Sequence, residues 1–193
     1  MSGAVSLSRT ALSSYTAGKT MSQSKRDAEF ERVLLPHLNS AYNLARWLLR
    51  NEQDAQDVVH DSFLRAHRYF GSFDGSDARA WLLGIVRNAC FTSLRANKVQ
   101  QMPADEDLDR QSSPEINPEH ALMLKEDLQA LRDCIEALPP EYREAVVLRE
   151  LEELSYKEIS VAAGIALGTV MSRLNRARVR LENCLTGKGK EIR

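Results

Sequence analysis

The chain contains few cysteines, few aromatic residues and no long apolar run. Its three cysteines, Cys90, Cys134 and Cys184, lie far apart and form no Cys-x-x-Cys pair. This spacing suggests neither a zinc site nor a disulfide framework, and a reducing cytoplasm is the expected location. No apolar segment approaches the roughly 20 residues that span a bilayer, so no insertion into a membrane is expected.

The chain also lacks an excess of charge of either sign. The 193 residues carry 26 Lys and Arg against 27 Asp and Glu, so any nucleic-acid site must be a local basic patch. The first 20 residues are rich in Ser, Thr and Ala and lack the apolar core of a signal peptide. We therefore expect a disordered tail over 1–26. The sequence leaves open whether translation begins at Met1 or Met21.

Strand alternation and Gly-rich phosphate loops are absent from the sequence, and apolar residues recur every three or four positions instead. This pattern predicts an all-α fold with two helical domains, over 27–98 and 120–186, and a C-terminal tail over 187–193. The front domain should hold three helices. The first runs from about Asp27 to Leu49, with Leu38 in its apolar stripe. The second is capped by Asn51, and the third by Ser76 or Asp77.

The helical pattern stops over 99–119. This segment has three prolines and six acidic residues against one arginine. Such a composition buries too little apolar surface to offset the entropy lost on ordering, which predicts a flexible acidic linker. A plain solvated spacer explains the same composition.

Two helices are expected directly after the linker. One covers 120–137, and the next covers 141–151 after Pro139-Pro140, since proline is tolerated in a first turn. Both have an apolar side that we expect to be buried. Its residues are Leu122, Leu124, Leu128, Leu131 and Ile135 on the first helix, and Tyr142, Ala145, Val146 and Leu148 on the second.

Residues 155–181 predict two short helices joined by a tight turn. Ser155 and Glu158 form a capping box, Gly164 suits a left-handed stop, and Thr169 is the expected cap of the second helix. That second helix carries four arginines and no acid. Together these features are typical of a helix-turn-helix that docks in the DNA major groove. An ordinary amphipathic helix with a solvated basic face is the plainer alternative.

The second helix supplies the candidate DNA contacts. Thr169, Ser172, Arg173 and Arg176 share one side of it, and an arginine there can bind guanine with two hydrogen bonds. Arg178 and Arg180 are expected to contact phosphates or the linker.

Two sequence blocks resemble a known family. The segment GTVMSRLNRAR, from Gly168, resembles region 4 of sigma-70-family transcription initiation factors, and NEQDAQDVVHDSFLRAHRYF with FDGSDARAWLLGIVRNACFTSLR resembles region 2. The blocks come in the family order with a short variable linker between them, which matches the extracytoplasmic-function (ECF) group. The resemblance covers roughly residues 30 to 185 and implies the helical bundle of region 2 and the helix-turn-helix of region 4.

The resemblance implies an alternative sigma factor that binds the clamp helices and flap of core RNA polymerase and directs initiation at a subset of promoters. An anti-sigma factor is the implied regulator. No cofactor, metal or catalysis by the chain is expected. The implied −35 contacts are Arg149, Tyr156, Thr169, Ser172, Arg173 and Arg176. The implied −10 contacts are Asp74, Arg87, Asn88, Ser93, Arg95 and Lys98. The implied polymerase contacts are Asp54, Asp57, Val58 and Asp61.

Plainer interpretations accompany several of these residues. The acidic face of the second helix suits any solvated helix, and Trp81 fits a core position better than a base pocket. Asn88 suits a local hydrogen bond equally well. A metal site at His60 and His67 is less expected than surface or interface histidines.

Some residues depart from the family pattern. Met171 stands where a basic residue is common, Ala162 and Ala163 replace bulkier residues, and Ala166 replaces a frequent proline. These departures affect the expected promoter preference and leave the arginines of the second helix in place. Two other functions stay open, namely a helix-turn-helix regulator that acts without polymerase and an adaptor whose basic helix binds an acidic protein.

Overall fold

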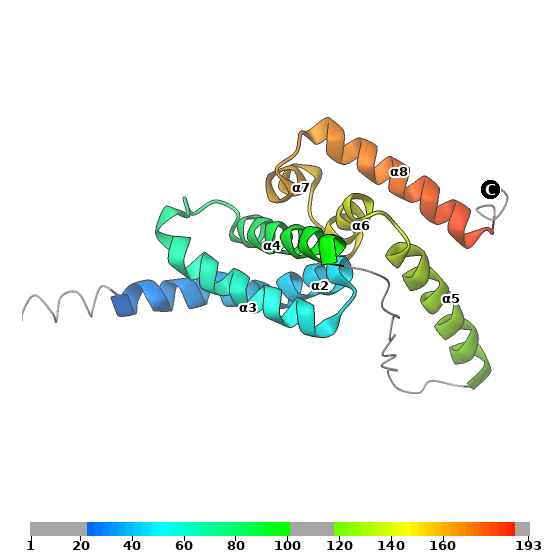
Figure 1. Ribbon diagram of the computed structural model, residues 1–193, viewed down its shortest axis with the longest axis horizontal. Coiled ribbons are helices and arrows are strands. Elements are labelled where there is room, and N and C mark those ends of the chain that lie inside the picture. The colour runs from blue at the N-terminus through cyan, green and yellow to red at the C-terminus, as the bar shows by residue number, and fades with distance from the viewer. Residues whose placement is uncertain (1–22, 101–117, 188–193) are drawn as a thin grey trace, which may run out of the picture.

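The computed structural model describes residues 23–100 and 118–187, and every regular element in these ranges is helical, as predicted (Figure 1). No helix in these ranges is both long and apolar enough to cross a membrane. The elements are a helix over 23–34, η1 (Leu35–His37), α2 (Leu38–Leu49), α3 (Glu52–Tyr69), η2 (Phe70–Ser72), α4 (Ala78–Gln100), α5 (Pro118–Glu136), α6 (Pro140–Val146), the π-helical turn η3 (Val147–Leu151), α7 (Tyr156–Ala163) and α8 (Leu167–Leu185).

Several predicted boundaries shift in the structure. Residues 23–26 are helical and do not belong to the expected tail. The two ends of the expected linker, 99–100 and 118–119, belong to α4 and α5, and the rest of it lies outside the described residues. The predicted first helix is interrupted at Pro36, which lies in η1, because proline has no amide to continue the helical hydrogen bonds. Leu38, expected in the buried stripe, is exposed beside this break.

The front half is a bundle in which α2, α3 and α4 pack on one another in all three pairs. Its core is aliphatic, and Leu44, Leu48, Leu82 and Val86 are fully buried. Burial of each such side chain contributes roughly 1.5–3 kcal/mol before the entropy cost. The bundle therefore holds α3 and α4 at fixed positions.

Side-chain caps fix where these helices begin. Asn51 accepts a hydrogen bond from the Asp54 amide at 2.9 Å, which confirms the predicted start of α3. Asp77 accepts from the Ala80 amide at 2.9 Å, so Asp77 rather than Ser76 caps α4. Trp81 packs against the core with its ring 5.2 Å from that of Phe73, which agrees with a packing role.

The apolar side of α5 is not buried as predicted. Leu128 and Leu131 are 66% and 37% exposed, and only the C-terminal end of the helix, with Cys134 and Ile135, is buried. The side chains of Leu122 and Leu124 lie outside the described residues. Figure 1 shows the N-terminal end of α5 leaning away from the other helices, so no other helix of residues 23–100 and 118–187 covers the exposed part of its face. Periodicity identified an apolar face but not what covers it.

The second predicted helix of this half is confirmed with one change. It begins at Pro140 and passes into the π-helical turn η3, and Ala145, Val146 and Leu148 are buried as expected, with Tyr142 half-buried. Arg143 and Glu144 are also buried, which the apolar pattern did not predict.

The helix-turn-helix has the predicted stops and core. The Ser155 hydroxyl accepts from the Glu158 amide at 3.2 Å and the Glu158 carboxylate accepts from the Ser155 amide at 2.6 Å. The hydrogen bond from Ser155 lowers the pKa of Glu158. Gly164 adopts φ 63°, in the left-handed region that favours glycine. Ile159, Val170 and Leu174 are buried between α7 and α8.

The expected cap of the second helix is wrong. Ala166, with extended backbone angles, precedes the first residue of α8, Leu167, and provides no side-chain hydrogen bond. Thr169 lies inside the first turn, where its amide donates to the Ala166 carbonyl at 2.8 Å. The turn between α7 and α8 therefore takes three residues, and α8 begins two residues before the Thr169 start that the sequence predicted.

The two halves pack into one body, mainly through α4 on α7 and α2 on α6. A Cβ atom added to Gly84 of α4 would lie 3.2 Å from the Ala162 carbonyl oxygen of α7, so glycine permits the close approach. The guanidinium of Arg143 donates to the Trp47 and Leu48 carbonyls of α2 and to the Glu136 and Leu138 carbonyls at the end of α5.

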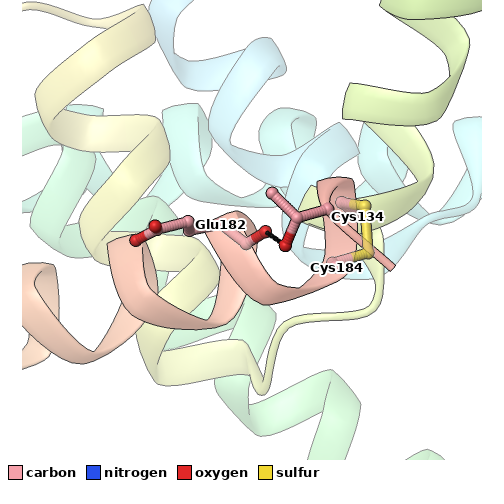
Figure 2. Close-up of a disulfide and its surroundings, with 4 residues drawn as sticks. Cys134, Glu182 and Cys184 are labelled. Carbon is pink, nitrogen blue, oxygen red and sulfur yellow. Dashed lines mark hydrogen bonds between the residues drawn. A yellow bond between two sulfur atoms is a disulfide. The ribbon is translucent and has the colours of Figure 1, made fainter. Parts of the chain in front are cut away.

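Cys134 and Cys184 form a disulfide, which corrects the expectation that the cysteines are unpaired. They are 50 residues apart in sequence, but α5 and α8 pack together and bring their Cα atoms to 5.9 Å (Figure 2). Beside the disulfide, the Thr186 hydroxyl donates to the Glu182 carbonyl at 2.7 Å. Cys90 is free and buried, and burial raises the pKa of its thiol to about 12.

The disulfide predicts a stability difference. Closing a loop of this length restricts the unfolded chain and should stabilise the folded protein by about 4 kcal/mol. We expect the double variant Cys134→Ser/Cys184→Ser to unfold at a lower denaturant concentration than the oxidised protein. The wild-type protein reduced with dithiothreitol is the matched control and should resemble the variant. Equal midpoints for the oxidised and reduced wild-type protein would contradict a stabilising role.

Candidate nucleic-acid interface

The N-terminal half of α8 presents a polar surface to solvent. Thr169, Ser172 and Arg176 are exposed there, and the Ser172 hydroxyl donates to the Thr169 carbonyl at 3.0 Å. The short turn after α7 and the buried Val170 and Leu174 set the direction of this helix. Three of the predicted −35 residues therefore lie together and are accessible.

Arg173 shares this helix face but is not accessible in the same way. Its side chain is 20% exposed, and its guanidinium donates to the Glu144 carboxylate at 3.3 Å. Arg173 therefore differs from the other three residues on this face, because its guanidinium is bound to Glu144 and is largely shielded from solvent.

Arg149 and Tyr156 lie together beside the start of α7. The guanidinium of Arg149 donates to the Leu154 carbonyl at 2.8 Å and lies 5.3 Å from the centre of the Tyr156 ring. Both side chains are half-buried. Nearby, Arg178 donates to Glu150 at 2.9 Å, and this hydrogen bond raises the pKa of Arg178. These contacts brace the loop that leads into the helix-turn-helix.

Glu144 pairs with two of the candidate DNA-binding arginines, which the sequence did not predict. Only 1% of its side chain is exposed, and its second oxygen accepts from Arg87 at 2.6 Å. Burial raises the pKa of Glu144, and the hydrogen bond and positive charges of Arg87 and Arg173 oppose this rise. A glutamate in the run EYREAVVLRE resembles any surface acid, so only the packing of both halves around α6 identifies it.

The front half carries the predicted −10 residues on α4 and the turn before it. Asp74 is exposed and accepts from the Ser76 amide at 3.0 Å, and hydrogen bonds from Ser76 lower the pKa of Asp74. Asn88 and Arg95 are exposed, and Ser93 is half-buried. The side chain of Lys98 lies outside the described residues.

Arg87 differs from the other α4 residues. Its side chain is 20% exposed, lies over the Phe91 ring at 4.4 Å, and donates to Asn88 at 3.1 Å as well as to Glu144. The two arginines that pair with Glu144, Arg87 and Arg173, therefore come from different predicted DNA surfaces.

The acidic face of α3 lies on the outside of the bundle. Asp57 and Asp61 are exposed, Asp54 is half-buried in the first turn, and Val58 packs partly against the core. Leu64, one turn further along, is 58% exposed. This face of α3 therefore combines exposed acidic side chains with one exposed apolar side chain.

The histidines do not form a metal site in the described part of the chain. His67 lies 2.9 Å from the Asp27 carboxylate, with its ring against Phe30, whereas His60 is exposed. Within residues 23–100 and 118–187, no group of three metal-ligating side chains lies together.

Two sequence profiles match the chain on its two halves. The profile of Sigma-70 region 2 matches residues 34–99, and the profile of Sigma-70 region 4 matches residues 128–181. The first covers α2, α3 and α4, and the second covers the end of α5 and the helix-turn-helix.

Curated relatives match across both halves. The chain is 34% identical to the ECF RNA polymerase sigma factor SigE of Mycolicibacterium smegmatis over 166 residues, 84% of this chain and 63% of that protein. It is 31% identical to the RNA polymerase sigma-H factor of Pseudomonas aeruginosa over 81% of this chain and 86% of that protein. The chain thus spans less than two thirds of the first relative and most of the second.

Solved structures share the fold. The sigma factor RpoE of Bartonella quintana, solved in complex with the anti-sigma factor NepR, superposes with a TM-score of 0.68 at 28% identity, covering 82% of this chain and 97% of that one. CnrH, solved with the cytosolic domain of CnrY, superposes with a TM-score of 0.62 at 24% identity, covering 87% and 94%. The two profiles in order on one chain, together with the curated relatives, show that the protein belongs to the sigma-70 family of RNA polymerase sigma factors, in its ECF group.

Proposed function

We propose that this chain is an alternative sigma factor that binds core RNA polymerase and directs initiation at a subset of promoters. The observation that carries this proposal is the presence of both regions, 2 and 4, in order on one chain. In this proposal residues 27–98 act as region 2, 120–186 as region 4, and 99–119 as the linker between them. A helix-turn-helix regulator that acts without polymerase would not need the front half.

The proposed −35 surface is the N-terminal half of α8 with the loop before α7. The exposed Thr169, Ser172 and Arg176 support base contacts in the major groove. Arg173 would join them once it leaves Glu144. Arg149 and Tyr156 would contact the DNA backbone beside them, since their aromatic and guanidinium groups lie at the same edge.

The proposed −10 surface combines α4 with the turn at Asp74. Melted DNA needs cations for its backbone and a pocket or flat surface for an unstacked base. Arg95 and Asn88 are exposed, so Arg95 can bind a DNA phosphate as a cation and Asn88 can bind one as a hydrogen-bond donor. Ser93, Arg87 and Lys98 lie on the same helix. The exposed Asp74 turn would receive the base.

The proposed polymerase surface is the outer face of α3, with Asp54, Asp57, Val58 and Asp61 docking on the basic clamp helices. Acidic side chains on a rigid helix favour fast association and fix the register of docking. Region 4 would contact the flap. The outer face of α3 has a fixed position because α3 packs on α2 and α4 in the front bundle.

We further propose that an anti-sigma factor holds the protein inactive in the cytoplasm, where DNA and polymerase reside. The support is the likeness over 82% of this chain to a sigma factor solved with its anti-sigma partner. The sigma factor itself would position polymerase and DNA while polymerase performs the chemistry.

A run-off transcription assay tests the main proposal. The purified chain is expected to confer initiation at defined start sites on core polymerase that lacks any sigma factor. Templates come from genomic fragments, and core enzyme alone is the control. Initiation no different from that of core enzyme alone would contradict the proposal.

Arg176→Ala tests the −35 surface. Loss of a base contact should weaken use of the cognate promoter by about 1–3 kcal/mol and leave binding to unrelated duplexes nearly unchanged. Arg180→Ala is the matched control, since Arg180 lies over the Tyr142 ring and is expected to contact phosphate. That variant should weaken all duplexes alike. A uniform loss with Arg176→Ala would instead identify a phosphate contact.

Asp57→Arg tests the polymerase surface. Placing a positive charge against basic clamp helices should weaken core binding by about tenfold, ~1.4 kcal/mol, in a binding titration. Asp57 is exposed, so the fold should persist by circular dichroism. Glu29→Arg, an equal charge change at an exposed site on the helix over 23–34, should bind normally. Unchanged binding by Asp57→Arg would exclude this face.

A further inference from the structure

The disulfide between Cys134 and Cys184 borders a cavity at the C-terminal ends of α5 and α8 (Figure 2). The cavity has a volume of about 440 Å³, and both cysteines line it together with Pro139, Arg180 and Asn183. Small-molecule sites in proteins have volumes of roughly 300–1,000 Å³. A molecule of that size would therefore lie directly against the disulfide.

The two cysteines of this bond differ in access to solvent. Cys184 is exposed in the last turn of α8, whereas Cys134 is only 6% exposed near the end of α5. Thiol–disulfide exchange begins when a thiolate attacks one of the two sulfurs, and access helps to decide which one is attacked. The exposure of Cys184 therefore directs an incoming thiolate to its Sγ atom, with the Sγ atom of Cys134 as the leaving group.

The polar groups of the cavity indicate which thiols fit it. Among the described residues that line it, Arg180 is the sole charged one, and its guanidinium lies 5.3 Å from the centre of the Tyr142 ring. A guanidinium pairs well with a carboxylate, and the Asn183 side chain adds a neutral hydrogen-bond donor. The cavity therefore suits a small thiol that carries a carboxylate.

The third cysteine does not compete for this chemistry. Cys90 is fully buried, and burial raises the pKa of its thiol to about 12, so the reactive thiolate is scarce at neutral pH. Disulfides of cytoplasmic proteins are usually transient, because cellular thiols reduce them. An exposed disulfide beside a cavity is the kind of bond that such thiols can reach.

We propose that the cavity is a reversible thiolation site for a small carboxylate-bearing thiol of the glutathione class. The thiolate of the small molecule attacks the Sγ atom of Cys184, and the bond to Cys134 breaks. Its electron pair leaves on the Sγ atom of Cys134, which takes a proton from water. One disulfide replaces another, so no net oxidation or reduction occurs. The reverse attack by the Cys134 thiolate expels the small thiol and restores the original bond.

The thiolation site goes beyond the proposed function and rests on it only for the cytoplasmic location, where such thiols occur. Its consequence for the chain is the loss of the covalent link between α5 and α8. The modified protein keeps only non-covalent contacts between these two helices.

Two matched variants separate the two sulfurs. Cys134→Ser leaves Cys184 free, Cys184→Ser leaves Cys134 free, and both lose the same disulfide. With oxidised glutathione, full-length Cys134→Ser should gain one glutathione roughly tenfold faster than Cys184→Ser, measured by intact-protein mass spectrometry. Equal rates would overturn the proposal. If Cys90 is also modified, that variant has unfolded and the wild-type experiment decides.

The wild-type protein tests the direction of attack. Exchange of the oxidised full chain with glutathione is stopped by acid at early times, and the products are mapped by peptide mass spectrometry. The adduct is expected on Cys184, with Cys134 as a free thiol. An adduct on Cys134 would overturn the assignment of the attacked sulfur, and loss of the disulfide without any adduct would overturn the thiolation site.

Arg180→Gln tests the cavity itself. Loss of one charge roughly 6 Å from a carboxylate in water should slow exchange with glutathione about threefold. Exchange with cysteamine, a small thiol without a carboxylate, should not slow. Lys157→Gln is the control, because it removes one positive charge from an exposed site on α7 that does not line the cavity. Equal slowing of both thiols by Arg180→Gln, or the same selectivity change with Lys157→Gln, would overturn the role of the cavity.

None of these measurements uses polymerase or promoter DNA. Failure of the chain in run-off transcription would count against the proposed function, while the exchange experiments would still decide the thiolation site.

Discussion

Two adjacent buried charges, Arg143 and Glu144, dictate how the halves of this protein meet. A charge removed from water needs partners in fixed positions. The guanidinium of Arg143 finds four carbonyls at the ends of α2 and α5, where helices leave such groups unpaired with partial negative charge. Burial lowers the pKa of Arg143 to about 10, so it stays cationic at neutral pH. Because these partners come from both halves, the halves fit together in one register.

Arg143 and Glu144 nevertheless bind partners of different kinds. The partners of Arg143 are backbone carbonyls at helix ends, where the helix itself supplies no further amide to bind them. The partners of Glu144 are Arg87 and Arg173, side chains whose family counterparts are expected on DNA. An interface built only for stability would be better served by apolar residues, since a buried ion pair contributes little net free energy. Glu144 instead fixes the positions of α4 and α8 relative to α6, because each arginine meets a different oxygen of its carboxylate.

The sequence predicted what depends on neighbours along the chain. The caps at Asn51 and Ser155 and the left-handed Gly164 are local, so their residue types sufficed. The sequence did not reveal that Cys134 meets Cys184, since that depends on α5 packing on α8. Nor did it reveal the burial of Glu144. Spacing and the family resemblance predicted the candidate DNA residues, but the ion pairs of Arg87 and Arg173 with Glu144 are tertiary contacts that neither could predict.

A disulfide and an apolar core hold the helices of region 4 together. The disulfide joins the end of α5 to the end of α8, and α6, which carries Glu144, lies between them in the chain and packs on α8. The other end of α8 is fixed by Val170 and Leu174 in the motif core. Contacts within this half are thus covalent, apolar and ionic, and one apolar cluster continues from this half into the front bundle. The two halves therefore share one core, while the disulfide and the ion pairs of α8 fix the helices of the second half relative to one another.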